Sequence, residues 1–161
     1  MRIVPAMNPR SNRRTRRTGA VLVEAALVLP VVLLFLLGLM EYSRYLMTLH
    51  VFTNAVSMGA SYAARHTSQI VINGTTYGNN NTNVLSVVNN ALAGQQLTSQ
   101  TTSVYLSDAL GNNLGTWTNA QAGQYVCVQI TGTYSFMLPK LLGLPSSITQ
   151  TFQSVKQSEG N

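Results

Sequence analysis

An apolar stretch that follows Gly19 and ends at Met40 constrains this chain more than any other feature, and it holds a single charged residue, Glu24. A helix of about 20 residues, rising about 1.5 Å per residue, matches the roughly 30 Å hydrocarbon core of a bilayer. A cleavable secretory signal would have a shorter apolar run ending at a small-residue site, which the residues before Glu41 lack. We therefore predict a retained transmembrane helix over residues 20–40.

Positive charge is concentrated ahead of this stretch. Six of the ten lysines and arginines precede Gly19, in a segment without acidic residues, whereas the other four are balanced by the four acidic residues. Because an excess of arginine beside an apolar span retains that end in the cytoplasm, we predict a basic cytoplasmic leader over residues 1–19 and an exported carboxy-terminal domain. Pro5 and Pro9 disfavour a helix in the leader. Nucleic-acid binding is a weaker alternative, and a twin-arginine export signal is weaker still because Thr18 and Gly19 follow the arginine pair.

The helical pattern continues beyond the span. Apolar residues recur at alternating spacings of three and four from Val28 to Ala63, which predicts an extramembrane continuation of the same helix over residues 41–66. This seam ends in small residues, Gly59, Ala60 and Ala63, which allow another element to approach the helix closely. That element is either the sheet of the same domain or a neighbouring subunit. The helix can pack against a neighbouring subunit along its membrane half and against its own sheet farther along.

Several residues near the span have positions that predict a local role. Pro30 removes one backbone hydrogen bond inside the span, so we expect a modest kink there. Tyr42 and Tyr45 fall where an interfacial aromatic belt is expected. Glu41 and Arg44 are spaced i, i+3, and we interpret them as a possible surface ion pair.

The remaining chain, residues 67–161, is predicted to form an exported α+β domain. Asn73-Gly74 between two short β-branched runs indicates a hairpin, and the alternation in residues 125–134 indicates the clearest strand. A short helix is expected over residues 84–93, capped by Asn83, and further strands over residues 101–107 and 148–155. The predicted fold is a long amino-terminal helix with a small antiparallel sheet of about four or five strands laid on its upper part.

Two features of this domain leave alternatives open. Cys127, the only cysteine, alternates away from the main apolar face, which predicts a half-buried side chain or, less simply, an intermolecular disulfide. Residues 136–145 are broken by Pro139, Gly143 and Pro145 yet are unusually apolar for a loop. They could plug the core, lie on the membrane surface or dock a partner, since exposed apolar patches usually have a role. We favour packing near the helix or the membrane interface.

The usual signs of an enzyme are missing from the sequence. His50 and His66 lack metal-binding spacing, and Asp108 and Glu159 are the only acidic residues after Arg44. There is no GxSxG elbow, P-loop or GxGxxG fingerprint. We therefore predict that the protein is not an enzyme, has no catalytic residues and needs no metal or cofactor.

One pattern is specific. A short basic leader ending in Gly19, with Glu24 five residues later in an uninterrupted apolar helix, resembles a type IV prepilin processing site. The stretch from residue 19 to about residue 66 further resembles the TadE-like family, the minor pilins or pseudopilins of tight-adherence (Tad/Flp) pilus systems. The matching positions are Glu24, Leu29-Pro30, Gly38, Glu41 and Arg44.

The resemblance implies how the chain is processed and where it acts. A prepilin peptidase would cut after Gly19, leaving Ala20 as a new amino terminus that can be methylated. The shortened chain would sit in a bacterial inner membrane, in contact with membrane lipid, with its domain in the periplasm or in an extracellular pilus. Its partners would be other pilin or pseudopilin subunits and an inner-membrane assembly platform, and it would bind no nucleic acid.

Glu24 is the candidate assembly residue. A carboxylate inside a bilayer costs several kcal/mol unless it is paired. The natural partner is the positive amino terminus of a neighbouring cleaved subunit. The alternative is a carboxylate solvated by headgroups near the cytoplasmic interface and favoured by the helix dipole.

Three functions follow as hypotheses. The leading one is a structural minor pilin or pseudopilin involved in pilus assembly or adhesion. The alternative from another class is a permanently anchored single-pass envelope binding module, which would keep residues 1–19. The third is a pseudopilin of another secretion or competence system.

Overall fold

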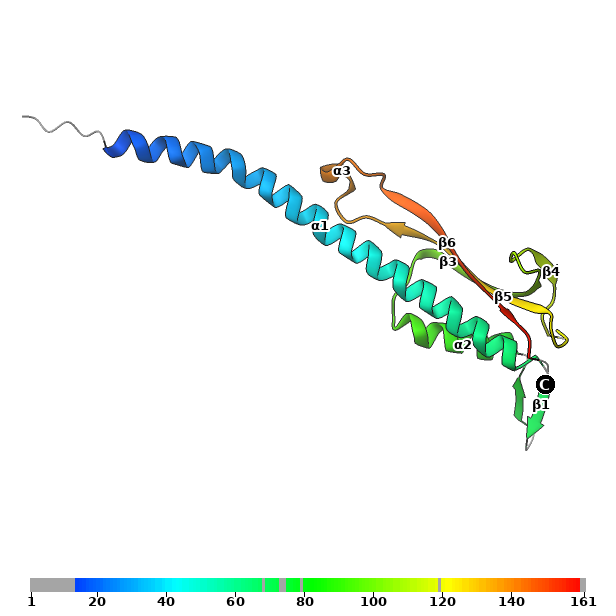
Figure 1. Cartoon of the computed structure of the whole chain (residues 1–161). Helices are drawn as coiled ribbons and strands as arrows, with labels where there is room; N and C mark the ends of the chain where they lie inside the picture. Colours follow the sequence, from blue (N-terminus) through cyan, green and yellow to red (C-terminus); the bar gives the residue numbers. More distant parts are fainter. Residues whose placement is uncertain (1–13, 68, 73–74, 79, 119, 160–161) are drawn as a thin grey trace, which may run out of the picture. The chain divides into compact units, whose positions relative to one another are not determined.

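The computed structural model describes residues 14–67, 69–72, 75–78, 80–118 and 120–159 (Figure 1). The chain forms two compact units, Met1–Met40 and Glu41–Asn161. Helix α1, Arg14–Arg65, begins in the first unit and ends in the second. A long apolar helix followed by a small antiparallel sheet is the predicted α+β fold, which is confirmed.

The first unit is the exposed, apolar part of α1. Its large aliphatic side chains, from Val21 to Met40, are mostly exposed. The helix is continuous through Pro30, so the loss of one backbone hydrogen bond there does not end it. The expectation that the leader is not helical is wrong for residues 14–18, because α1 already begins at Arg14. Both leader prolines lie outside the described residues, and arginine is a good helix former.

The second unit contains two sheets. Strands β1, Gln69–Ile72, and β2, Thr75–Gly78, form the expected hairpin, whose turn lies outside the described residues. The main sheet has the order β4-β3-β5-β6 and is antiparallel throughout. Its strands are β3, Thr98–Ser107, β4, Asn113–Gly115, β5, Tyr125–Ser135, and β6, Ser147–Gln157. Of these, β4 is the strand that sequence alternation did not predict.

The core lies where the second half of α1, α2 and the sheet meet. Figure 1 draws α2 and the sheet beside this half of α1. A Cβ atom added at Gly59 would lie 2.5 Å from Val88 Cγ2 on α2 and 3.4 Å from Val128 Cγ1 on β5. The small-residue seam therefore packs against elements of its own domain, one of the two roles expected for it. Strand β5 supplies Val126, Val128 and Ile130 to this core, as its alternation predicted.

Helix α2, Asn81–Leu92, begins earlier than expected. Asn80, not Asn83, is the N-cap, and its side chain accepts a hydrogen bond from the Thr82 amide. Three asparagines at positions 80, 81 and 83 make several starts locally possible. A long-range contact accompanies the observed start, since Trp117 Nε1 donates to Asn81 Oδ1 at 2.6 Å.

Cys127 is fully buried, which corrects the expectation of a half-buried side chain. It lies opposite Tyr105 in the β3–β5 register, on the face away from α1. The connection after β3 covers this face, because Tyr105 donates its hydroxyl hydrogen to Gly111 O at 3.2 Å. A Cβ atom at Gly111 would contact Gln153 and Val155 of β6. In this fold the thiol is not accessible for an intermolecular disulfide.

Candidate functional site

The three residues predicted for processing and assembly all lie on exposed helix. Gly19, Ala20 and Glu24 belong to α1 within the first unit, and each is exposed. Nothing lies within 4 Å of a Cβ atom built at Gly19. Ala20 and Glu24 are four residues apart and therefore share one face of the helix, one turn from each other. The structure gives these residues a common, accessible surface.

A second constellation begins at Glu41, the first residue of the second unit. Its side chain is only 3% exposed, and its Oε1 atom accepts three hydrogen bonds. The donors are Arg44 Nη2 at 2.8 Å, the Tyr134 hydroxyl at 3.2 Å and the Met137 backbone amide at 3.3 Å. We call Glu41, Arg44, Tyr134 and Met137 the Glu41 cluster. It joins α1 to the end of β5 and to the segment that follows it.

Arg44 bridges two elements within this cluster. Its Nη2 atom also donates to Ser135 O at 2.9 Å, and its guanidinium lies 5.2 Å from the centre of the Tyr134 ring. The side chain of Arg44 is 36% exposed. The pair of Glu41 and Arg44 therefore differs from the expected surface pair, because the carboxylate is buried beneath residues more than ninety positions away. Breaking such a pair leaves a desolvated charge, so it resists separation.

An aromatic group packs beside the cluster. Tyr134 makes edge-to-face contacts with Tyr45 at 5.3 Å and with Phe136 at 5.1 Å between ring centroids. Gln150 Nε2 donates to the Tyr45 hydroxyl at 3.2 Å. Tyr45 thus packs against the core of the folded domain, whereas Tyr42 is exposed.

Burial and hydrogen bonding act in opposite directions on the pKa of Glu41. Desolvation raises the pKa, but the hydrogen bonds from Arg44, the Met137 amide and Tyr134, with the charge of Arg44, outweigh it and lower the pKa below its ordinary value. At Tyr134, by contrast, desolvation dominates and raises the pKa of the hydroxyl. The cluster therefore keeps Glu41 ionised and its charge compensated.

This arrangement is suited to holding elements together. The carboxylate is shielded and already saturated at Oε1, so it is poorly placed to act as a general base. Sequence reasoning found the i, i+3 pair but missed its burial and its aromatic and backbone partners. The only available signal was that Glu41 and Arg44 are both signature positions.

His66 directly follows the last residue of α1. His66 contacts the Tyr62 carbonyl through Nδ1 at 2.8 Å and stacks on the Tyr62 ring. Among the described residues, no group of three or more histidine, cysteine, aspartate or glutamate side chains could hold a metal ion. The part of α1 from Gly19 onward is long and apolar enough to cross a membrane.

Comparison with known proteins gives one match. Residues 19–61 match the family described as TadE-like protein. The match begins at the expected processing residue and includes Glu24, Glu41 and Arg44. No curated protein and no solved structure matches the chain.

Proposed function

We propose that this chain, whose residues 19–61 match the TadE-like family, is a structural minor pilin or pseudopilin of a Tad/Flp-type pilus. A prepilin peptidase removes residues 1–19, and the shortened chain takes part in pilus assembly or adhesion. The family is associated with Tad pili and is structural.

The observation that carries this proposal is where the family match begins. It starts at Gly19 and continues through an exposed apolar helix that carries Glu24 four residues after Ala20. A peptidase needs an accessible bond, and an assembling helix needs an exposed apolar face. Both requirements are supported by the exposure of Gly19 and of the following residues.

The proposed topology follows from charge and length. The arginine-rich leader stays in the cytoplasm, residues 20–40 cross a bacterial inner membrane, and the second unit is exported. Helix residues 41–65 belong to that exported unit together with the sheet. The partners are the prepilin peptidase, other pilin or pseudopilin subunits and the inner-membrane assembly platform.

Glu24 is the proposed assembly contact. After cleavage, the amino group of Ala20 in one subunit pairs with the Glu24 carboxylate of a neighbour, which removes the cost of an unpaired charge in the bilayer. The single turn between Ala20 and Glu24 presents a donor and an acceptor on one helix face. No enzymatic role is proposed.

The test is the intact mass and amino-terminal sequence of the protein purified from membranes of cells with and without a prepilin peptidase. The expected chain begins at Ala20 only when the peptidase is present. A Gly19→Val variant should stay full length in both cells, whereas Gly38→Ala, a change at another glycine of the same helix, should be cleaved normally. A full-length wild-type chain in both cells would instead support a permanently anchored binding module.

A further inference from the structure

Residues 136–145 form a segment with two different surfaces, and we call it the apolar loop. Phe136 packs into the domain, in ring contact with Tyr45 and Tyr134. Beyond it, Met137, Leu141 and Leu144 are 60%, 55% and 40% exposed. Helix α3, Pro139–Leu142, is a single turn ended by Gly143 at φ 66°. The loop thus plugs the core with one side chain and leaves three large apolar side chains uncovered.

The apolar loop is fixed in place by backbone hydrogen bonds. The Met137 amide donates to Glu41 Oε1 at 3.3 Å, and the Phe136 amide donates to Ser146 O at 3.2 Å. The Leu144 amide donates to Pro139 O at 2.9 Å and closes the turn. The exposed side chains are therefore held on an ordered scaffold and not on a free tail.

The attachment to Glu41 sets the depth of the loop. Glu41 directly follows Met40, the last residue of the apolar span. A segment hydrogen-bonded to Glu41 must lie close to the level at which the helix leaves the bilayer. In a bilayer, three exposed apolar side chains at that level would meet the headgroup region, where apolar and polar groups are both accommodated.

The charges nearby also fit a lipid surface. Lys140 is the only charged residue in the loop, and it is exposed. The negative charge of Glu41 is compensated by Arg44 and shielded from solvent. Tyr42, which is 58% exposed, is the type of residue that favours the membrane interface. Anionic headgroups would therefore meet a cation and no uncompensated acid.

We infer that the apolar loop is a membrane-interface anchor. Met137, Leu141 and Leu144 insert into the leaflet from which α1 emerges, to about the 5–10 Å depth of other interfacial elements, and Lys140 binds anionic headgroups. The loop thereby makes a second attachment of the exported unit to the bilayer, in addition to the covalent link through α1. This inference rests on membrane insertion of residues 20–40, and it does not depend on cleavage after Gly19 or on Glu24.

The experiment measures lipid contact in the full-length chain. Leu141→Cys is made in a Cys127→Ala background, labelled with an environment-sensitive fluorophore and reconstituted into vesicles of phosphatidylcholine and phosphatidylglycerol. Phosphatidylcholine brominated near the headgroup or deep in the acyl chains then serves as the quencher. We expect a large loss of fluorescence that is greatest with the shallow bromine, and a smaller loss when Met137 and Leu144 are both changed to Asp.

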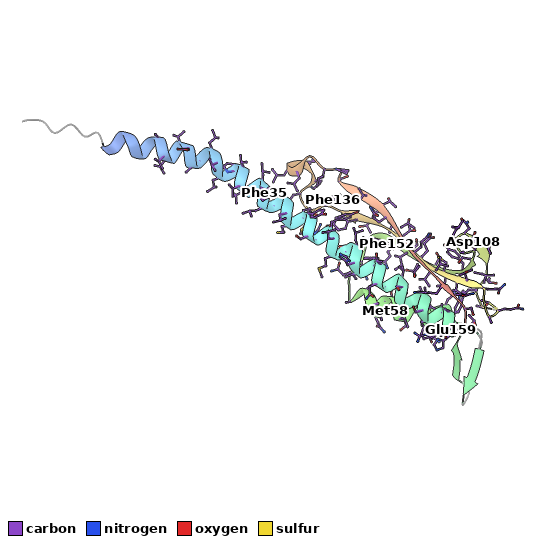
Figure 2. The ribbon with its side chains drawn as sticks, viewed as in Figure 1. Phe35, Met58, Asp108, Phe136, Phe152 and Glu159 are labelled. Carbon is purple, nitrogen blue, oxygen red and sulfur yellow. The ribbon has the colours of Figure 1, made fainter. Side chains whose placement is uncertain are left out.

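Leu114→Cys is the matched control, because Leu114 is also an exposed leucine and lies at the other end of the sheet. Strand β5 separates the two regions by about 33 Å at 3.3 Å per residue. Figure 2 shows Phe136 and Asp108 at these opposite ends. A label at position 114 should keep its fluorescence with either bromolipid.

Three outcomes would overturn the inference. The first is quenching at position 141 no greater than at position 114. The second is a label at position 141 that becomes more protected from solvent as the amount of protein per vesicle is raised but is not quenched by bromolipid. That result would assign the loop to a protein partner. The third is an absence of quenching at a Leu33→Cys label in the span, which would remove the membrane insertion on which the inference rests. Cleavage after Gly19 is scored separately by mass, so failure of the pilin proposal remains distinguishable.

Discussion

At the scale of single residues, Glu41 shows that the structural role of a charged residue depends on the segments that pack around it. Its spacing from Arg44 is typical of an exposed helix pair, which contributes a few tenths of a kcal/mol. The structure instead buries the carboxylate and adds Tyr134 and the Met137 amide as donors. The same two residues therefore hold the first turn of the second unit to the end of β5.

Replacing Glu41 should destabilise the folded domain. Glu41→Ala leaves the Arg44 guanidinium, the Tyr134 hydroxyl and the Met137 amide without their acceptor, and we expect a loss of about 2–3 kcal/mol, as for hydrogen bonds to a charged group. Chemical unfolding of the full chain in detergent micelles, followed by circular dichroism, measures this loss. Glu159→Ala is the control, because Glu159 is exposed and the change should stay within about 0.5 kcal/mol. Equal effects of the two substitutions would contradict a structural role for the cluster.

The Glu41 cluster should also make stability depend on pH. Because the folded-state pKa of Glu41 lies below its ordinary value of 4.5, its stabilising contribution is full above that pH and is lost as the pH falls through the folded-state pKa. Asp108, whose pKa is also lowered, adds a loss of the same sign. Thermal melts of wild type and Glu41→Gln should therefore converge as the pH is lowered below 4.5. A difference that stays constant down to the acid limit would rule out Glu41 as the titrating group.

At the scale of elements, the packing of α2 and the sheet limits the size of the side chains on the buried face of the second half of α1. Helical spacing predicted the buried face, and small residues predicted a close approach. The observed neighbours are Val88 of α2 and Val128 of β5, both fully buried. Helix, helix and sheet thus meet at Gly59, where a side chain would collide with a stiff β-branched residue.

A methyl group at Gly59 should test this packing. In Gly59→Ala the new Cβ would lie 2.5 Å from Val88 Cγ2, so one of the elements must shift. Overpacking costs about 1–3 kcal/mol, which exceeds the gain of up to about 1 kcal/mol in helix propensity. We expect a net loss in the free energy of unfolding and a partial recovery in Gly59→Ala/Val88→Ala.

The control for this prediction is Asn54→Ala, a substitution at an exposed position of α1. It should leave stability nearly unchanged, because alanine is a better helix former than asparagine and the side chain is outside the core. A Gly59→Ala protein as stable as wild type would show that a methyl group fits between α1, Val88 and Val128 without a shift of these elements.

At the scale of the whole molecule, the two units have different proposed tasks. The first presents an apolar helix with one acid, and the second presents a folded domain whose own core is complete. Under the pilin proposal, the apolar helix of the first unit leaves the bilayer during assembly and packs against other subunits, while the second unit keeps its fold. The proposed lipid anchor at residues 136–145 would have to leave the bilayer in that exchange.

Glu24→Ala should separate membrane insertion from assembly. Loss of the carboxylate leaves an apolar helix that inserts at least as well, so membrane fractionation should be unchanged. Assembly should fall because the amino group of Ala20 loses its proposed partner, and counting surface pili by electron microscopy measures this. Glu24→Asp, which keeps the charge, should retain more assembly than Glu24→Ala. Wild-type numbers of pili in Glu24→Ala would exclude the pairing.

Sequence alone predicted those parts of this protein that depend on neighbours along the chain. Apolar length and flanking charge predicted the span, three-four spacing predicted α1, and alternation predicted β5. The signature around Gly19 and Glu24 predicted the family, which matched over residues 19–61. Each of these signals is local, because helix and strand periodicity and membrane partition are set within one segment.

Tertiary structure decided the features that join distant segments. The burial of Glu41 needs Tyr134 and Met137, the burial of Cys127 needs the connection through Gly111, and the start of α2 is accompanied by a contact from Trp117. No periodic pattern in the sequence predicts these pairings, because the burial of a side chain depends on which distant segment packs over it. Sequence therefore determined the long helix, most of the strands and a segment apolar enough to cross a membrane, and only the packed fold decided which polar residues became interior.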